Sequence, residues 1–283
     1  MSFNTIKTAA LLGLLSAVLI VGGGAIAGHN GMYFGLALAV VMNFSSYFFS
    51  DKIALMSYNA QPVNETQNPE VYGRVAPIVR NLTQRMGLPM PKLWIIPEDS
   101  TNAFATGRNP QHASVAFTSG ILQIMDDREI EGVVAHELGH VLHRDILISS
   151  VAATLAAAIT LLARFAFFFE GGGRRDDRNG GGIFGAIAMM ILAPIAAMLI
   201  QMAISRSREY DADAASAKYT GTPYELISGL QKLEAYSKRI PMEATPSTAH
   251  LFIVKPRLGL GLGNLFSTHP PTEERIRRLQ EMR

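Results

Sequence analysis

Two histidines, with a glutamate directly after the first, lie in the stretch VVAHELGHVLHRD at residues 133–145. At 3.6 residues per turn, His136 and His140 share one face of a helix, one turn apart, so both imidazoles can reach a single cation. Glu137 then projects towards the open coordination position, where its carboxylate can take a proton from water. The pattern predicts a hydrolytic zinc site with Glu137 as its catalytic residue.

The third ligand must come from elsewhere in the chain. There are no cysteines, so a thiolate is excluded, and Ile146 occupies the position where an HExxHxxGxxH pattern has its third histidine. Glu209 and Asp213, in the stretch EYDAD, are four residues apart and share a helix face. Glu209 can complete the site, and Asp213 can orient a ligand histidine through its second ring nitrogen. On spacing alone, an exposed acidic helix face remains the alternative.

The composition and four apolar runs indicate a membrane protein. Hydrophobic residues make up 48% of the 283-residue chain and charged residues only 17%, against about 25% in a typical soluble domain. A helix needs about 20 apolar residues to cross a bilayer, and the runs predict four spans, at about residues 8–28, 32–50, 146–163 and 183–204. The stretch GHNGM at residues 28–32 predicts a tight turn between the first two. For the first run, a cleaved signal peptide ending near AIA (25–27) is the alternative.

Four spans place residues 51–145 and 205–283 on the same side of the membrane as the N-terminus. Basic residues beside spans are enriched on the cytoplasmic side, which favours a cytoplasmic site, although the loop EGGGRRDDRNGGG (170–182) then carries three arginines outside. We therefore expect four segments. They are an N-terminal transmembrane hairpin (1–50), a first catalytic part with the HELGH helix (51–145), a second transmembrane hairpin (146–204) and a second catalytic part with the third ligand (205–283).

The polar segments predict an α+β fold of helices and a small β-sheet. Helical periodicity and capping residues predict helices at 68–87, 128–145, 205–221, 222–239 and 269–282. Short β-rich runs predict strands at 92–97, 102–107 and 114–120, the last two joined by the turn RNPQH. The net charge of +2 and the lack of a long basic cluster argue against nucleic acid as a partner.

Several motifs together resemble the HtpX-type membrane metalloproteases of peptidase family M48, relatives of the CAAX prenyl protease. They are HELGHVLHRD, SRSREYDADAASAKYTG, NAFATG, LFSTHPPTEERI and the four spans, and the resemblance covers nearly the whole chain. It implies a zincin-like (gluzincin) catalytic domain with one zinc ion per subunit on His136, His140 and Glu209. It assigns Glu137 as general base and acid and Asp213 as the partner of His136. It also implies a bacterial inner-membrane enzyme that degrades damaged or misassembled membrane proteins at a cytoplasmic site.

Two further motifs bear on substrate binding. NAFATG (102–107) looks like the edge strand above the zinc in thermolysin-like enzymes, where Asn102 and Ala103 would contact the substrate backbone. An ordinary internal strand is the alternative. THPP places a histidine near the cleft in the resembling family, but a plain helix start explains it equally well. The candidates for steadying the oxyanion are His269, Tyr210, Arg206 and Arg208.

We expect membrane-protein or unfolded polypeptide substrates, because the metal helix runs directly into the third apolar run and so lies at the bilayer surface. An intramembrane protease of the site-2 type also uses HExxH, but there the motif lies within a span. Here four acidic residues precede it, Asp126, Asp127, Glu129 and Glu131. The second alternative is a non-catalytic membrane scaffold with a retained zinc site, and the intact Glu137 argues against it.

Overall fold

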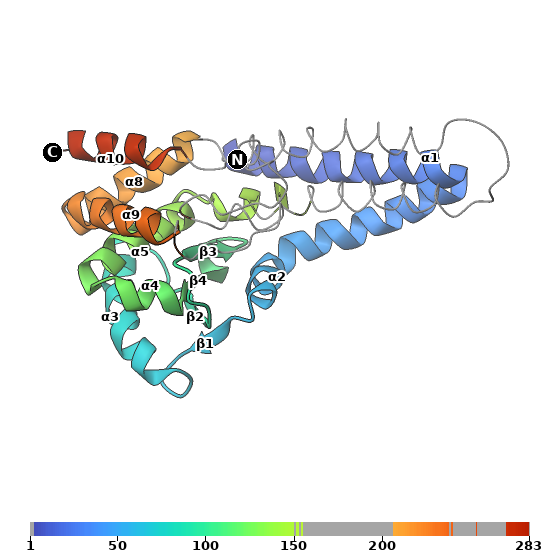
Figure 1. The fold of residues 1–283 in the computed structure, drawn as a ribbon. Coiled ribbons are helices and arrows are strands. Elements are labelled where there is room, and N and C mark those ends of the chain that lie inside the picture. The colour runs from blue at the N-terminus through green and yellow to red at the C-terminus, as the bar shows by residue number, and fades with distance from the viewer. Residues whose placement is uncertain are drawn as a thin grey trace.

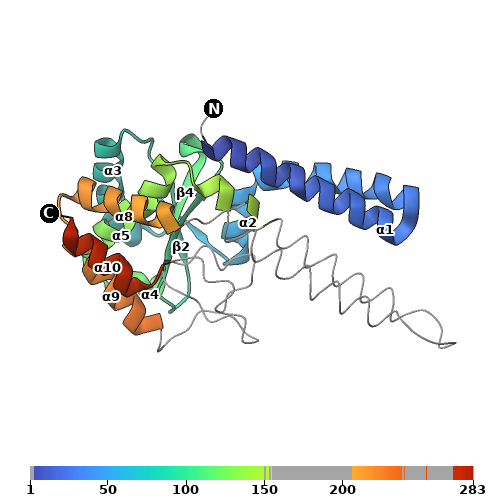
Figure 2. The same cartoon turned by 90° about the horizontal axis from the view of Figure 1, so that it is seen from above.

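The computed structural model describes residues 3–149, 151–152, 154, 206–237, 239, 253 and 270–282. Most of the predicted third span, the fourth span, the loop between them and His269 lie outside these residues. The described residues form a helical hairpin that projects from an α+β domain, as the two views in Figure 1 and Figure 2 show.

Helix α1 (Phe3–Phe48) is folded back on itself to make the hairpin. It is broken at Ala27 and Gly28, where Gly28 takes a φ of 60°, so the turn begins one residue before the predicted stretch 28–32. The two arms touch through glycines. A Cβ on Gly23 would lie 2.2 Å from the carbonyl oxygen of Gly31, and the lack of side chains there lets the two backbones pack closely.

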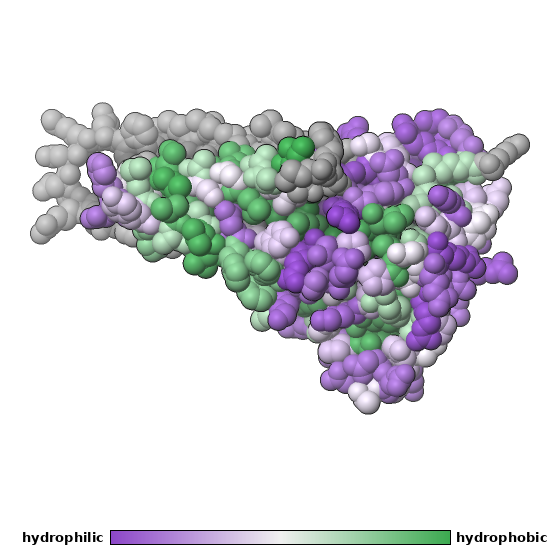
Figure 3. Space-filling model, turned by 180° about the vertical axis from the view of Figure 1, so that it is seen from behind, coloured by the Kyte–Doolittle hydropathy of each residue, from purple (hydrophilic) through white to green (hydrophobic). Residues whose placement is uncertain are grey.

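Both arms, Ile6–Gly24 and Ala27–Phe48, have the length and composition of a membrane span. Only 17% and 22% of their apolar stretches are buried inside the molecule, so they differ from the core helices of a soluble protein. In Figure 3 the hydrophobic residues gather on this hairpin, and the hydrophilic residues cover much of the domain. The first two predicted spans are therefore present by length and composition.

The domain contains a four-stranded mixed sheet in the order β1-β2-β4-β3. Its strands are β1 (Gln61–Val63), β2 (Lys92–Ile96), β3 (Ala103–Gly107) and β4 (Ala113–Thr118). β2 and β4 are parallel, whereas β1 and β3 each pair antiparallel with their neighbour. Among the residues that the structure describes, β3 therefore lies at the edge of the sheet and not inside it, as its likeness to thermolysin-like edge strands predicted.

Helix α2 (Ser50–Ser57) joins the hairpin to the sheet. It begins directly after α1 ends, with one residue between them. Its residue Leu55 and the following Tyr58 pack against Ile96, Phe104 and Ala116 of the sheet in a small buried cluster. This apolar contact fixes the base of the hairpin to the domain.

Helix α5 (Asp127–Leu142) lies at the centre of the domain. It starts with a capping box, in which the Asp126 side chain accepts from the amide of Glu129 and the Glu129 side chain accepts from the amide of Asp126. The helix is buried along most of its length. Three helices pack against it: α3 (Pro69–Met86), α8 (Arg206–Thr220) and α9 (Tyr224–Ser237). A fourth helix, α10 (Thr272–Glu281), packs against α8 and α9.

The predicted α+β class, the five polar helices and the three strands are all present, with differences at their ends. The strand predicted at 114–120 ends at Thr118, because the Thr118 hydroxyl accepts a hydrogen bond from the amide of Ile121 and so caps α4 (Ser119–Ile124). The last helix begins at Thr272, after the two prolines rather than at residue 269. The short elements β1, α2 and α4 were not predicted, whereas the 3₁₀ helix Pro110–His112 lies within the turn predicted at RNPQH.

Candidate metal centre

A glycine lets the two helices of the candidate site approach each other closely. A Cβ on Gly139 of α5 would lie 3.1 Å from Cα of Ala212 and 3.2 Å from Cβ of Ala215, both on α8. These distances are tighter than ordinary van der Waals contact, so any larger residue at position 139 would push α8 away. The close packing places Glu209 and Asp213 opposite the HELGH face of α5.

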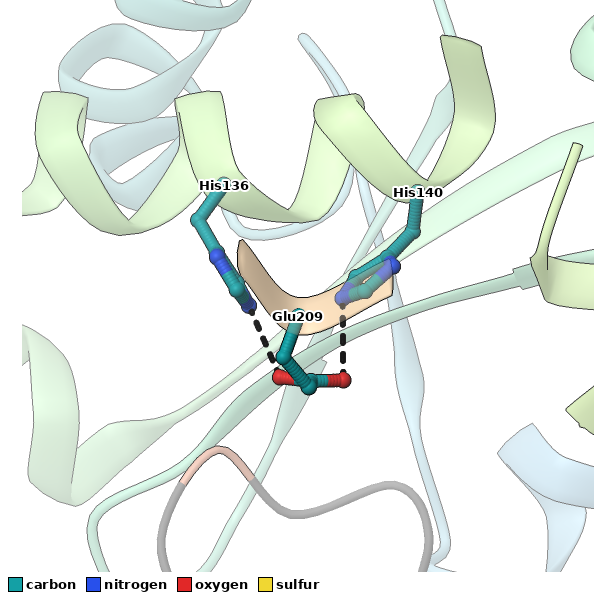
Figure 4. Close-up of side chains that lie close together, drawn as sticks. All are labelled: His136, His140 and Glu209. Carbon is teal, nitrogen blue, oxygen red and sulfur yellow. Dashed lines mark ion pairs between the residues drawn. The ribbon is translucent and has the colours of Figure 1, made fainter. Parts of the chain in front are cut away.

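The structure brings the three predicted ligands together (Figure 4). Ligand atoms of His136, His140 and Glu209 all lie within 4.8 Å of one another. Nε2 of His136 is 3.7 Å from one Glu209 oxygen, and Nε2 of His140 is 3.5 Å from the other. Ligands held about 2.1 Å from an ion at the tetrahedral angle lie about 3.4 Å apart. The two histidine–glutamate distances are close to this value, so these three side chains could hold a metal ion.

The predicted catalytic carboxylate lies beside this cluster. Glu137 is buried, and one of its oxygens accepts a hydrogen bond of 2.8 Å from the backbone amide of Ala105 on β3. Burial raises the pKa of Glu137 to about 7. A carboxylate with this pKa can accept and release a proton near neutral pH, as general acid–base catalysis requires.

His136 contacts a buried ion pair, Asp213 and Arg275, which we call the inner pair. Nδ1 of His136 lies 2.9 Å from Asp213. Arg275 binds the same carboxylate through both oxygens, at 2.6 and 2.9 Å. With Nδ1 donating to Asp213, the lone pair of Nε2 faces Glu209 and is available to a metal.

The electrostatics of the inner pair favour this arrangement. Burial raises the pKa of Asp213, but the adjacent Arg275 outweighs it and holds that pKa at about 2. Burial, together with the charge of Arg275, lowers the pKa of His136 to about 4. Asp213 is therefore ionised and His136 neutral at physiological pH, and neutral imidazole is the form that binds metals.

Arg275 was not predicted from the sequence. It lies among several charged residues of EERIRRLQ, a pattern typical of a solvated helix. A signal was nevertheless present, because Arg275 is four residues before the buried Leu279 and so belongs to the apolar face of α10. Arg275 is itself buried. A charge on the buried side of an amphipathic helix indicates a partner in the core.

His140 has a different environment from His136. Its side chain is 16% exposed, against 1% for His136. Burial lowers its pKa, but the neighbouring Glu209 and a hydrogen bond with Asp145 outweigh this and raise the pKa of His140 to about 9. The two imidazoles of the cluster therefore have opposite protonation tendencies in the metal-free protein.

The predicted substrate contacts lie in different surroundings. The Asn102 side chain accepts from the amide of Ile253, whose carbonyl accepts from Arg275, so Asn102 is linked to the inner pair. The backbone carbonyl of Asn102 accepts from the amide of Thr118. Alternate residues of β3, including Ala103 and Ala105, therefore direct their backbone groups away from β4.

The structure describes three of the four candidates for steadying the oxyanion. The guanidinium of Arg278 stacks on the ring of Tyr210, 3.8 Å from its centroid, and Arg206 is exposed at the start of α8. Arg208 is buried, with Nη1 3.8 Å from Asp145. His269 lies outside the residues that the structure describes.

Comparison with known proteins identifies the family of the chain. The family described as Peptidase family M48 matches residues 69–283. The chain is 52% identical to a Protease HtpX homolog of Paraburkholderia phytofirmans, over 99% of this chain and 97% of the relative. It is 53% identical to a Protease HtpX homolog of Ralstonia pickettii, over the same shares.

A solved structure shares the fold. The crystal structure of S. mikatae Ste24p matches 98% of this chain with a TM-score of 0.56 and 18% sequence identity. This chain spans 64% of the Ste24p chain. Taken with the HELGH helix, the buried carboxylate beside it and the apolar hairpin, these matches show that the chain belongs to peptidase family M48, among the membrane metalloproteases of the HtpX type.

Proposed function

We propose that the protein is a zinc endopeptidase of the bacterial inner membrane that hydrolyses peptide bonds of damaged or misfolded membrane proteins. The convergence of His136, His140 and Glu209, with Glu137 beside them, carries the proposal. Two imidazoles and one carboxylate, with a fourth position open, are typical ligands of hydrolytic zinc. The likeness to HtpX-type proteases supports a role in protein quality control. No observation favours a non-catalytic scaffold or a site-2 type enzyme.

The residues around the cluster can carry out peptide hydrolysis. Zinc bound there would supply a Lewis acid that acidifies water and polarises the scissile carbonyl. Glu137 takes the proton of the attacking water and delivers it to the leaving amine. The amide of Ala105 holds the Glu137 carboxylate in place during both transfers.

The edge strand supports binding of an extended polypeptide. Ala103 directs its backbone groups away from β4, and two residues later Ala105 bonds to Glu137. A substrate strand that pairs with Ala103 would therefore pass directly beside the catalytic carboxylate. Pairing through backbone groups makes little demand on side chains, which suits an enzyme that acts on many unfolded chains.

The chain order supports four spans and a site at the membrane surface. α5 ends just before the third apolar run, and α8 begins just after the fourth. In this arrangement the segments 51–145 and 205–283 form one catalytic domain on the cytoplasmic side. The hairpins 1–50 and 146–204 anchor it in the bilayer, close to substrates that are themselves in the membrane.

A single substitution tests the proposed function. Glu137→Gln keeps the size of the side chain but removes the base, so zinc content should stay at one per chain while cleavage of an unfolded membrane protein falls at least about 10²-fold. The matched control is Glu131→Gln on the same helix, which should cleave like the unaltered protein. Metal analysis and cleavage, with and without chelator, measure both. Cleavage by Glu137→Gln at the unaltered rate would refute the proposal.

A further inference from the structure

The backbone after the metal helix has an unusual conformation. Arg144 takes a φ of 61°, a left-handed conformation that a residue with a Cβ rarely adopts. Its amide bonds to the carbonyl of Val141, and the amide of Asp145 bonds to the carbonyl of His140. This pair of bonds is a Schellman motif, which usually has glycine at the left-handed position. A strained turn of this kind suggests that the position of the next residue matters.

The turn directs the next side chain back over the metal helix. Asp145 is buried, and its Oδ2 lies 3.5 Å from Nδ1 of His140. The other ring nitrogen of His140, Nε2, lies 3.5 Å from Glu209. Asp145 therefore lies near Nδ1 of His140 as Asp213 lies near Nδ1 of His136, on the side of the ring that faces away from the metal cluster.

A basic residue from α8 completes this second arrangement. Arg208 is buried, and its Nη1 lies 3.8 Å from Oδ1 of Asp145. A buried carboxylate needs a nearby positive charge to remain ionised at low cost. Asp145 and Arg208, which we call the outer pair, thus repeat on His140 the plan that the inner pair has on His136.

We propose that Asp145 is a positioning residue for the metal. It accepts a hydrogen bond from Nδ1–H of His140 and so keeps the Nε2 lone pair aimed at the ion, while Arg208 holds the Asp145 carboxylate in place. This inference rests on the proposed zinc site. It gives Arg208 a role behind the metal ligand and takes it out of the set of oxyanion donors.

Metal affinity tests the proposal in the full-length protein in detergent. Asp145→Ala should weaken zinc binding by about 10- to 100-fold, the usual effect of removing the partner of a ligand histidine. Asp145→Asn keeps a hydrogen-bond acceptor but loses the charge, so its zinc affinity should lie between those of the unaltered protein and of Asp145→Ala. Competition with a chelator of known affinity measures zinc binding. Asp211→Asn removes an exposed charge two residues from Glu209 on α8, and it should bind zinc like the unaltered protein.

The visible spectrum of the cobalt-substituted protein separates positioning from a merely structural role. Tilting of the His140 ring should change the cobalt bands of Asp145→Ala and Arg208→Met, but not those of Asp211→Asn. Should Asp145→Ala fail to fold, the double variant Asp145→Asn/Arg208→Met, which leaves no unpaired charge, takes its place. Unaltered zinc affinity and cobalt bands in the Asp145 variants would overturn the inference alone. Failure of the unaltered protein to bind zinc would overturn the proposed function and the inference with it.

Discussion

The two histidines of the metal centre are supported on the same plan but with different tightness. On the buried side, His136 lies 2.9 Å from Asp213, which Arg275 binds at 2.6 and 2.9 Å. On the more open side, the contacts of His140 with Asp145 and of Asp145 with Arg208 measure 3.5 and 3.8 Å. Charge-assisted hydrogen bonds are strong only at the shorter distances.

This difference in contact distance predicts different roles for the inner pair and the outer pair. The inner pair is deeply buried and fully bonded, so the loss of one member would leave an uncompensated charge in the core and should affect folding as well as metal binding. The outer pair makes longer contacts and lies beside the partly exposed imidazole of His140. Its loss should therefore affect the orientation of His140 more than the stability of the fold. Arg275→Met tests this division directly, and two further substitutions test whether stability and metal binding can be separated in this domain.

The largest effect is expected from Arg275→Met, which breaks the inner pair. It leaves Asp213 buried without its partner, and we expect a loss of about 3–5 kcal/mol in the free energy of unfolding. Thermal unfolding of the metal-free protein measures it. Arg277→Met, on the same helix with a side chain that is 58% exposed, should leave the melting temperature nearly unchanged. A melting temperature for Arg275→Met as high as that of its control would contradict the proposed asymmetry.

A smaller effect is expected from Gly139→Ala, which changes the distance between α5 and α8 and so acts on the surroundings of both histidines at once. The new Cβ must displace Ala212 and Ala215 by a few tenths of an ångström, and overpacking of this kind costs about 1–3 kcal/mol. Because α8 carries Glu209, zinc affinity should fall together with stability. The control is Gly73→Ala on α3, where a Cβ meets nothing within 4 Å and where alanine should be neutral or stabilising. Equal effects of the two substitutions would show that helix separation does not limit the site.

The smallest effect is expected at a buried carboxylate remote from the metal. Burial raises the pKa of Glu129, but hydrogen bonds from Lys232 and Ser228 lower it below its ordinary value. A lowered pKa contributes stability that is present above the unfolded value of 4.5 and lost as the pH falls below it. Glu129→Gln should therefore lower the free energy of unfolding by about 1 kcal/mol at pH 7.

The pH dependence sharpens this last prediction. The difference in melting temperature between Glu129→Gln and the unaltered protein should shrink as the pH falls below 4.5, because the carboxylate is then protonated first in the unfolded state and, at a lower pH, in the folded state as well. Zinc affinity at pH 7 should stay unchanged, in contrast to the two preceding variants. A loss of zinc in Glu129→Gln would show that stability and metal binding are not separable in this domain.

Much of the fold followed from local patterns, but the contacts between distant segments did not. The HELGH helix has a capping signal, and α8 and α9 have clear ends, so their periodicity predicted them. β1 has only three residues, which is too few to show any alternation. The end of β4 was hidden because Thr118 continues the strand pattern and also caps α4.

The candidate site was predicted unevenly for the same reason. The spacing of His136, Glu137 and His140 is local, whereas the spacing of Glu209 and Asp213 left an exposed acidic helix face as the alternative, and the family resemblance then joined them to the histidines. Asp145 and Arg275 were missed because a single charge near a helix end or on a helix face usually faces water. Only the packing of α10 and the left-handed turn at Arg144 show that these two are buried.

The place of Arg275 in the chain, at position 275 of 283, has a consequence for biosynthesis. A ribosome makes both histidines first, Glu209 later, and Arg275, which binds the carboxylate beside the first histidine, later still. A growing polypeptide that has not reached Glu209 therefore lacks the third ligand, and one that has not reached Arg275 lacks the partner of Asp213.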